Sequence, residues 1–189
     1  MLGGARGAVC ALANSRFAGA RPFSGKIPLM LFAKIFLLAL LAFPSLVFGG
    51  DIGVNVYGLS YHFERARAKE RHLDNEFNPG LGARYRSALN ESVDWFADAG
   101  AYHDSGRNTA VVAGAGVFWK ASEGLRLGGA LAFFHSKTYN EGRAFVAPLP
   151  IAAYEWRYVT FNVAYAPRLG NVNAVNVLDF WLTFFPGKI

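Results

Sequence analysis

The sequence predicts an all-β chain that closes into an eight-stranded antiparallel transmembrane β-barrel of an outer membrane. Three observations predict it: an export signal near the N-terminus, strands that alternate bulky apolar residues with small ones, and connections that alternate between long and short. The predicted strands have roughly the length that a tilted strand needs to cross a bilayer. Closure is expected because an open sheet edge would leave unpaired N–H and C=O groups in lipid.

The first fifty residues differ in character from the remainder. Lys34 precedes an apolar run of about ten residues that ends at Pro44 and is followed by small residues, as in a secretory signal peptide. This run is shorter than the roughly 20 residues that a spanning helix needs, which favours a cleaved signal over a retained anchor. We expect cleavage near Gly49, which divides the chain into a leader, residues 1–49, and a barrel domain, residues 50–189.

The leader also carries most of the basic excess of the chain. It holds five of the 19 Lys and Arg residues and no acid, so 14 bases face 13 acids in the barrel domain. This balance gives no support for nucleic-acid binding. The single cysteine, Cys10, lies in the leader, and we therefore expect neither an internal disulfide nor a thiolate metal site in the barrel domain. Both Met1 and Met30 fit as the start residue.

The eight strands are expected at residues 52–63, 77–87, 92–102, 109–120, 125–136, 144–154, 158–166 and 174–185. In the first strand, the alternation places Tyr57 and Leu59 on the bulky face and Gly58 and His62 on the other face. A soluble barrel would bury its bulky face and expose Lys and Glu. These strands carry few Lys and Glu residues, which favours a bilayer around the barrel.

The predicted connections are of two kinds. Four are longer and more polar than the other three, as expected for external loops and periplasmic turns. The long ones are 64–76, 103–108, 137–143 and 167–173, and the short ones are 88–91, 121–124 and 155–157. The charged segment 64–76 is expected to be mainly a solvated loop, with a helical turn as the alternative.

The outer rim of this barrel gathers residues that are suited to acyl transfer. His62 ends the first strand there, and Asp104 and Ser105 end the third, two strand spacings or roughly 10 Å away. They supply a base, a carboxylate and a hydroxyl. The alternative is that they are ordinary loop residues, since outer loops are polar in every such barrel. No spacing of His, Asp or Glu suggests a metal site, and no cofactor is expected.

Several segments together resemble the PagP family, the outer-membrane lipid A palmitoyltransferases, over nearly the whole barrel domain. They are His62, the pair Asp104 and Ser105, and the segments 114–116, 148–150 and 158–167. The resemblance implies an enzyme of the bacterial outer membrane that moves a palmitate-like acyl chain from phospholipid to lipid A, with His62, Asp104 and Ser105 required for the transfer. We expect it to act as a monomer.

The resemblance also implies how the acyl chain is held. Gly116 would set the depth of the acyl pocket, and Pro148 and Pro150 would weaken strand pairing at a lateral entrance for lipid. Small inward residues leave room for a chain in a barrel of this size, but glycines also simply permit tight coiling of the sheet. For the function, the alternatives are an inactive relative and a non-catalytic barrel that binds or stabilises lipopolysaccharide or an external partner.

Overall fold

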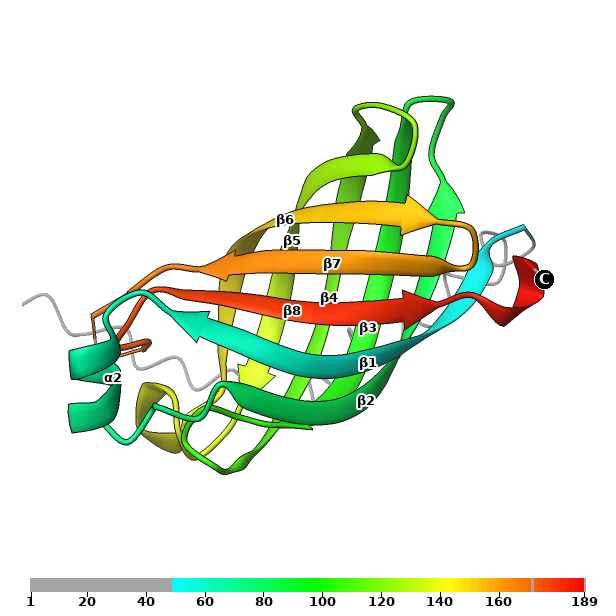
Figure 1. Cartoon of the computed structure of the whole chain (residues 1–189). Coiled ribbons are helices and arrows are strands. Elements are labelled where there is room, and N and C mark those ends of the chain that lie inside the picture. The colour runs from blue at the N-terminus through cyan, green and yellow to red at the C-terminus, as the bar shows by residue number, and fades with distance from the viewer. Residues whose placement is uncertain (1–48, 171, 189) are drawn as a thin grey trace, which may run out of the picture. The chain divides into compact units, whose positions relative to one another are not determined.

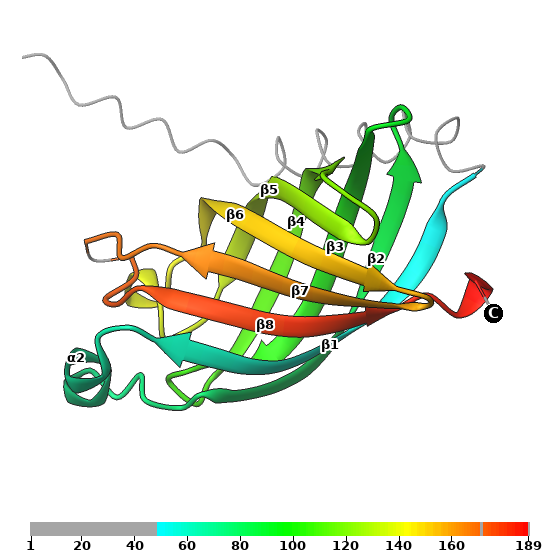
Figure 2. The same cartoon turned by 45° about the horizontal axis from the view of Figure 1, so that its top comes forward.

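A computed structural model describes residues 49–170 and 172–188 of the chain. Residues 1–48 of the expected leader, including Cys10, lie outside the described residues. Each strand pairs with its neighbours in sequence, and β1 (Asp51–His62) also pairs with β8 (Val177–Phe184), which closes the sheet into a barrel. These two strands lie side by side in both views (Figure 1, Figure 2). Among the described residues, no helix is long and apolar enough to cross a membrane.

The predicted eight-stranded antiparallel barrel is confirmed. In chain order the elements are β1 Asp51–His62, α2 Arg65–Glu70, β2 Phe77–Ala88, β3 Val93–His103, β4 Thr109–Lys120, β5 Leu125–His135, η1 Asn140–Gly142, β6 Phe145–Trp156, β7 Val159–Ala166, β8 Val177–Phe184 and η2 Pro186–Lys188. The long connections gather at the end of the barrel that carries α2, and the short turns lie at the other end (Figure 1). We call these the outer and the inner end.

Apolar side chains cover the outside of the barrel, and polar side chains are buried within it. Large exposed apolar residues include Ile52, Leu81, Val117, Leu131, Val146 and Phe161. Buried polar residues include Asn55, Arg84, Asn162 and Thr183. This distribution is the reverse of that in a water-soluble domain, and it agrees with the alternation in the sequence.

The first strand departs from strict alternation at one point. Its register with both neighbours shifts between Tyr57 and Leu59, which marks a β-bulge. A bulge adds one residue to a strand, so positions on either side of it no longer alternate in phase. Tyr57 consequently lines the interior pocket, whereas Leu59 is 57% exposed. The prediction that both residues share the bulky face is therefore wrong for Tyr57.

The middle of the barrel is filled by a network centred on Arg84. Its guanidinium makes two hydrogen bonds to the Asp98 carboxylate, at 2.8 and 2.7 Å, and donates a third to Oδ1 of Asn162 at 2.7 Å. Asn162 donates in turn to Thr183, and Thr183 donates to Asn55. Arg84 is only 1% exposed, so this ion pair is nearly free of water. Asp98 of this network also lines an interior pocket.

Residues 64–76 at the outer end are mostly exposed, in agreement with the expected solvated loop, and they include the helical turn α2 that was the alternative. Ala68 of α2 is 1% exposed and packs with Leu73, Val175 and Val177 in a small apolar cluster. The cluster joins the first outer loop to the last one. It forms because the segment before β8 stays irregular until Val177, which lets Val175 turn towards the helix.

A polar latch between Glu64 and Asn176 fixes the same two loops to each other. The Glu64 carboxylate accepts hydrogen bonds from the Asn176 backbone N–H at 2.8 Å and from its side-chain amide at 2.6 Å. The Asn176 amide oxygen accepts from the Tyr165 hydroxyl at 2.7 Å. The bond from the Asn176 backbone is the main reason why the pKa of Glu64 lies below its ordinary value.

Candidate functional site

His62 and Ser105 are in direct contact at the outer end of the barrel. His62 is the last residue of β1, and Ser105 lies in the loop after β3. The Nε2 atom of His62 lies 3.0 Å from Oγ of Ser105. Both side chains are shielded from solvent, with 1% and 4% of their surface exposed. A hydroxyl within hydrogen-bond distance of an imidazole is the arrangement in which a serine can be activated as a nucleophile.

The carboxylate nearest to the other ring nitrogen of His62 belongs to Glu76. Its Oε1 atom lies 3.7 Å from Nδ1 of His62 and accepts a hydrogen bond from the His62 backbone N–H at 3.4 Å. An acid at Nδ1 favours the tautomer that carries its proton there, which leaves Nε2 free to accept the proton of Ser105. Glu76 is itself held by Arg65 at 3.5 Å.

Asp104 makes its side-chain hydrogen bonds with groups of two outer loops. Its Oδ1 atom accepts hydrogen bonds from the backbone N–H groups of Gly106 and Asn108, at 3.0 and 2.9 Å, and from the Thr138 hydroxyl at 2.9 Å. Its Oδ2 atom accepts from the Ser136 hydroxyl. The carboxylate is thus turned towards the loops and away from His62. It fixes the turn that holds Ser105, and Glu76 takes the place next to the imidazole.

Tyr139, in the loop between β5 and β6, is the neighbour of Ser105 on the side of the barrel interior. Burial raises the pKa of the Tyr139 phenol, the charges of Asp179 and Asp104 raise it further, and hydrogen bonding with Ser105 lowers it in part. The phenol therefore stays protonated at neutral pH and can donate a hydrogen bond. Its ring also lines an outer pocket that Asp179 shares.

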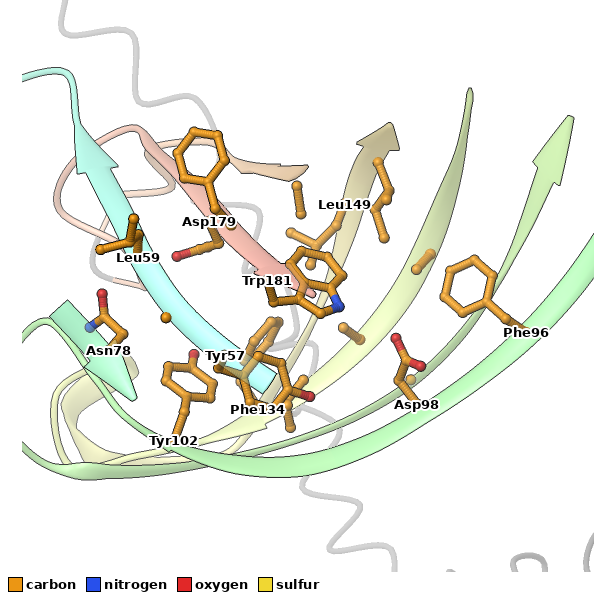
Figure 3. A pocket seen from close by; sticks show the side chains of 18 residues that line it. Tyr57, Leu59, Asn78, Phe96, Asp98, Tyr102, Phe134, Leu149, Asp179 and Trp181 are labelled. Carbon is orange, nitrogen blue, oxygen red and sulfur yellow. The ribbon is translucent and has the colours of Figure 1, made fainter. Parts of the chain in front are cut away.

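A mainly apolar pocket lies inside the outer half of the barrel, with an empty volume of about 690 Å³. Its lining residues include Tyr57, Phe96, Gly114, Ala132, Leu149 and Trp181 (Figure 3). The stacked rings of Phe96 and Phe118, 4.6 Å apart, and the guanidinium of Arg84 over Phe96 form its floor.

A layer of polar side chains separates this pocket from the His62–Ser105 pair. Ser60 precedes His62 by two residues on the inward face and donates to Asn78, which lines the pocket, at 2.6 Å. Asn78 also donates to the backbone oxygen of His103 at 3.0 Å. Neither His62 nor Ser105 lines the interior pocket.

Gly116 lies outside the lining of the interior pocket. A Cβ atom at this position would come within 2.6 Å of the Phe96 ring and within 2.4 Å of the backbone oxygen of Gly129. The Phe96 ring thus occupies the space that the sequence assigned to the end of an acyl chain. The neighbouring inward residues of the same wall, Gly114 and Ala132, do line the pocket, and they lie nearer its mouth.

Pro148 and Pro150 lie on the exposed, outward face of β6. Among the described residues, β6 pairs with β7 only from Ile151 to Trp156, so the outer half of β6 has no partner on β7. A pocket with an empty volume of about 500 Å³ runs along this half, with Leu149 on one side and Val177 on the other. The weakened pairing that the sequence suggested near the prolines is therefore present, between β6 and β7.

Glu76 and Tyr139 are the site residues that the sequence did not reveal. Glu76 is one of four acids between β1 and β2, and no local pattern shows which of them returns to His62. Tyr139 lies in a polar loop with no alternation to fix its direction. The signal that could have found Glu76 is its position next to Phe77, where β2 begins beside the end of β1.

Comparison with known proteins gives structural similarity alone. No protein-family model and no curated protein matches the chain. It is similar to a barrel from the de novo design of transmembrane β-barrels, with 14% identity, 72% of this chain and 95% of that chain covered, and a TM-score of 0.47. The designed barrel TMB2.3 is 15% identical to the chain; the match covers 74% of this chain and 97% of TMB2.3, with a TM-score of 0.44. Ail, the attachment invasion locus protein of Yersinia pestis, is 13% identical to the chain; the match covers 71% of this chain and 94% of Ail, with a TM-score of 0.39.

Proposed function

We propose that this barrel spans the bacterial outer membrane and transfers an acyl chain at the pair His62 and Ser105. A continuous apolar exterior around a polar interior supports the membrane location, because lipid would cover the exposed apolar residues. The closed sheet supports it too, since every strand has hydrogen-bonded neighbours and a bilayer offers none. The outer end then carries the site, at the level of the outer leaflet.

The contact of 3.0 Å between Nε2 of His62 and Oγ of Ser105 carries the proposed chemistry. In the first step, His62 takes the hydroxyl proton while Oγ attacks the ester carbonyl of a phospholipid. The acyl–oxygen bond of the ester then breaks, and the leaving alkoxide of the lysophospholipid takes the proton from His62. In the second step, a hydroxyl of lipid A gives its proton to His62 and attacks the acyl-serine. The chain passes to lipid A, and Ser105 recovers the proton.

Tyr139 is suited to stabilise the charge that develops on the carbonyl oxygen. Its phenol is protonated and lies close to Ser105, where a donated hydrogen bond stabilises negative charge in the transition state. Glu76 stabilises the protonated imidazole from the other side. The two residues thus support opposite charges that appear in the same step.

The interior pocket and the gap beside β6 supply a route for the chain. A lipid in the membrane reaches the interior between β6 and β7, where strand pairing stops at Ile151. Its acyl chain lies in the apolar pocket, which Phe96 lines. Because His62 and Ser105 are almost fully buried, the outer loops have to move before the ester reaches them.

The test uses the purified barrel in vesicles that contain phospholipid with a labelled acyl chain and lipid A as acceptor. We expect labelled lipid A with the unaltered protein and none above background with Ser105→Ala or His62→Ala. Ser122→Ala, an exposed serine in an inner turn, is the matched control and should be fully active. Heat-modifiable gel mobility shows that each variant is a folded barrel. Transfer by a folded Ser105→Ala barrel would refute the proposed nucleophile.

A second candidate, binding of lipopolysaccharide without catalysis, is favoured by the charge of α2. Arg65, Arg67 and Lys69 are exposed at the outer end, where phosphate groups of the glycolipid would lie. In the vesicle experiment, this function predicts lipid A binding that Ser105→Ala leaves unchanged and no transfer of label by any variant. The two functions therefore differ in whether labelled acyl chain is transferred to lipid A.

A further inference from the structure

Asp179 brings a carboxylate into the otherwise mainly apolar pocket. It projects inward from β8, where it is paired in register with Ser60 of β1. Val177, two residues earlier on β8, is in register with His62, so Asp179 lies about 7 Å deeper than His62 at the rise of about 3.4 Å per residue. It lines both the interior pocket and the outer pocket beside β6. A chain that passes from one pocket to the other would pass this residue.

Asp179 and Tyr102 are both half-buried, and both line the interior pocket. Tyr102 projects from β3 into the same cavity, so the two polar groups come from different strands (Figure 3). A polar group that lines a mainly apolar pocket favours a ligand that offers it a hydrogen bond. Ionisable residues inside a membrane protein are rare, and they commonly belong to a functional site.

The remaining acids and bases inside the barrel are accounted for by one another. Asp98 is paired with Arg84 at 2.7 Å, and at the inner end Glu155 is paired with Arg86 and Arg126. Asp179 differs because, in the part of the chain that the structure describes, it forms no ion pair and no base lines the two pockets that it shares. Tyr102 and Tyr139 line the outer pocket together with Asp179.

We propose that Asp179 and Tyr102 bind a hydroxyl group on the acyl chain, and that the pocket selects chains hydroxylated near their carbonyl end. This inference rests on the proposed function and names the substrate class for it. A hydroxyl satisfies Asp179 in either protonation state, because it can donate to a carboxylate and accept from a carboxylic acid. An unsubstituted chain presents only methylene groups at this depth and offers neither polar group a hydrogen bond.

The size of the selection follows from the cost of the missing hydrogen bonds. About 1–3 kcal/mol corresponds to a preference of roughly 5- to 150-fold for the hydroxylated chain. A site built to hydrogen-bond a hydroxyl rejects the analogue without it far more strongly than an apolar slot distinguishes chain lengths. The preference should therefore exceed any difference between chains that differ by one methylene.

The experiment measures binding of two neutral probes, methyl 3-hydroxypalmitate and methyl palmitate, to the detergent-solubilised barrel by equilibrium dialysis. The ester groups avoid a second negative charge beside Asp179. We expect the unaltered protein to bind the hydroxylated probe roughly 10-fold or more tightly. Asp179→Leu should abolish this preference and bind methyl palmitate more tightly. Asp179→Asn should retain most of the preference, since the amide both donates and accepts.

Asp74→Asn, an exposed acid in the first outer loop, is the matched control and should keep the full preference. Equal affinity of the unaltered protein for the two probes would overturn the inference, and so would an undiminished preference in folded Asp179→Leu. Binding needs no transfer, so the readout is independent of Ser105. A hydroxyl preference without transfer of label would refute the proposed acyl transfer and would still support the assignment of the pocket. Transfer of label without a hydroxyl preference would refute the pocket assignment alone.

Discussion

The position of the His62 ring depends on contacts from three segments that are far apart in sequence. Ser105 contacts Nε2, Glu76 lies beside Nδ1, and β1 itself holds the backbone. Asn75 links the first two segments. Its backbone N–H donates a hydrogen bond to the backbone carbonyl oxygen of Ser105 at 3.3 Å, and its side-chain amide donates to the backbone carbonyl oxygen of Asp104 at 3.1 Å. The contact between the loop before β2 and the loop after β3 therefore positions Glu76 and Ser105 around His62.

Replacing Glu76 with Gln should lower the rate of acyl transfer about 10- to 100-fold while the barrel stays folded. The amide cannot stabilise the protonated His62, and it does not favour the tautomer with its proton on Nδ1. The measurement is the initial rate in vesicles as a function of pH, and the acid limb of the profile should move to lower pH, because the charge of Glu76 raises the pKa of His62. Glu70→Gln, an exposed acid of α2, is the control. Equal rates for both variants would show that Glu76 has no part in the reaction.

Sequence reasoning reached His62 and Ser105 because strand alternation and loop length both point to the outer rim. It did not reach Glu76, because the geometry of a charged loop is set by packing that the local sequence does not encode. Ala68 and Val175 make that packing, and they lie more than a hundred residues apart. Tyr57 was misplaced for a related reason, since a β-bulge leaves no reliable mark in the sequence.

At the level of elements, α2 and the segment before β8 form a cover over the site. The Glu64–Asn176 latch and the apolar cluster around Ala68 hold this cover in place. The stability of the latch depends on pH. The folded-state pKa of Glu64 is lowered, so its contribution is complete above the ordinary value of 4.5 and is lost as the pH falls through the folded-state value.

The cover should therefore loosen when the pH falls below about 4.5, the ordinary pKa of the Glu64 carboxyl group. The measurement is hydrogen exchange of the Ala68 and Val175 amides, corrected for the intrinsic effect of pH. In Glu64→Gln the exchange should depend less on pH. Asp74, whose pKa Arg107 lowers through a hydrogen bond, accounts for the remaining dependence. Unchanged protection of Ala68 down to pH 3 would contradict the assignment of the latch.

The wall formed by β4 and β5 should set the length of the chain that the pocket accepts. Ala132→Phe places a ring into the pocket above Phe96, and the transferred acyl chain should become shorter by several carbons. Mass spectrometry of the product measures this length. Ala113→Phe, on the exposed face of β4, is the matched control. An unchanged product length in a folded Ala132→Phe barrel would mean that the chain does not enter this pocket.

At the scale of the whole molecule, the barrel is an apolar shell around a polar network. Inside the shell, a buried apolar cluster around Phe96 and Phe118 packs beside this network. The sequence predicted this shell well, because alternation directly reports which face is apolar. The sequence did not predict which polar residues pair inside the barrel. Arg84, Asp98 and Asn162 meet there because of the register between strands, which alternation does not reveal.

Arg84→Met should lower the free energy of unfolding by about 3–5 kcal/mol, because it leaves the Asp98 carboxylate buried without its partner. Urea unfolding of the barrel in lipid vesicles gives this value. The double variant Arg84→Met/Asp98→Leu should recover most of the loss, since it removes the uncompensated charge. A single variant as stable as the unaltered protein would show that the network does not support the barrel.

The proposed acyl transfer to lipid A can be tested by mass spectrometry of lipid A from bacterial cells that carry this protein, its Ser105→Ala variant or neither. We predict a lipid A species with one additional acyl chain only in cells with the unaltered protein. Surface labelling and heat-modifiable mobility must show equal amounts of folded barrel for both forms. An identical acyl pattern in all three strains, with the barrel correctly inserted, would contradict the proposed acyl transfer.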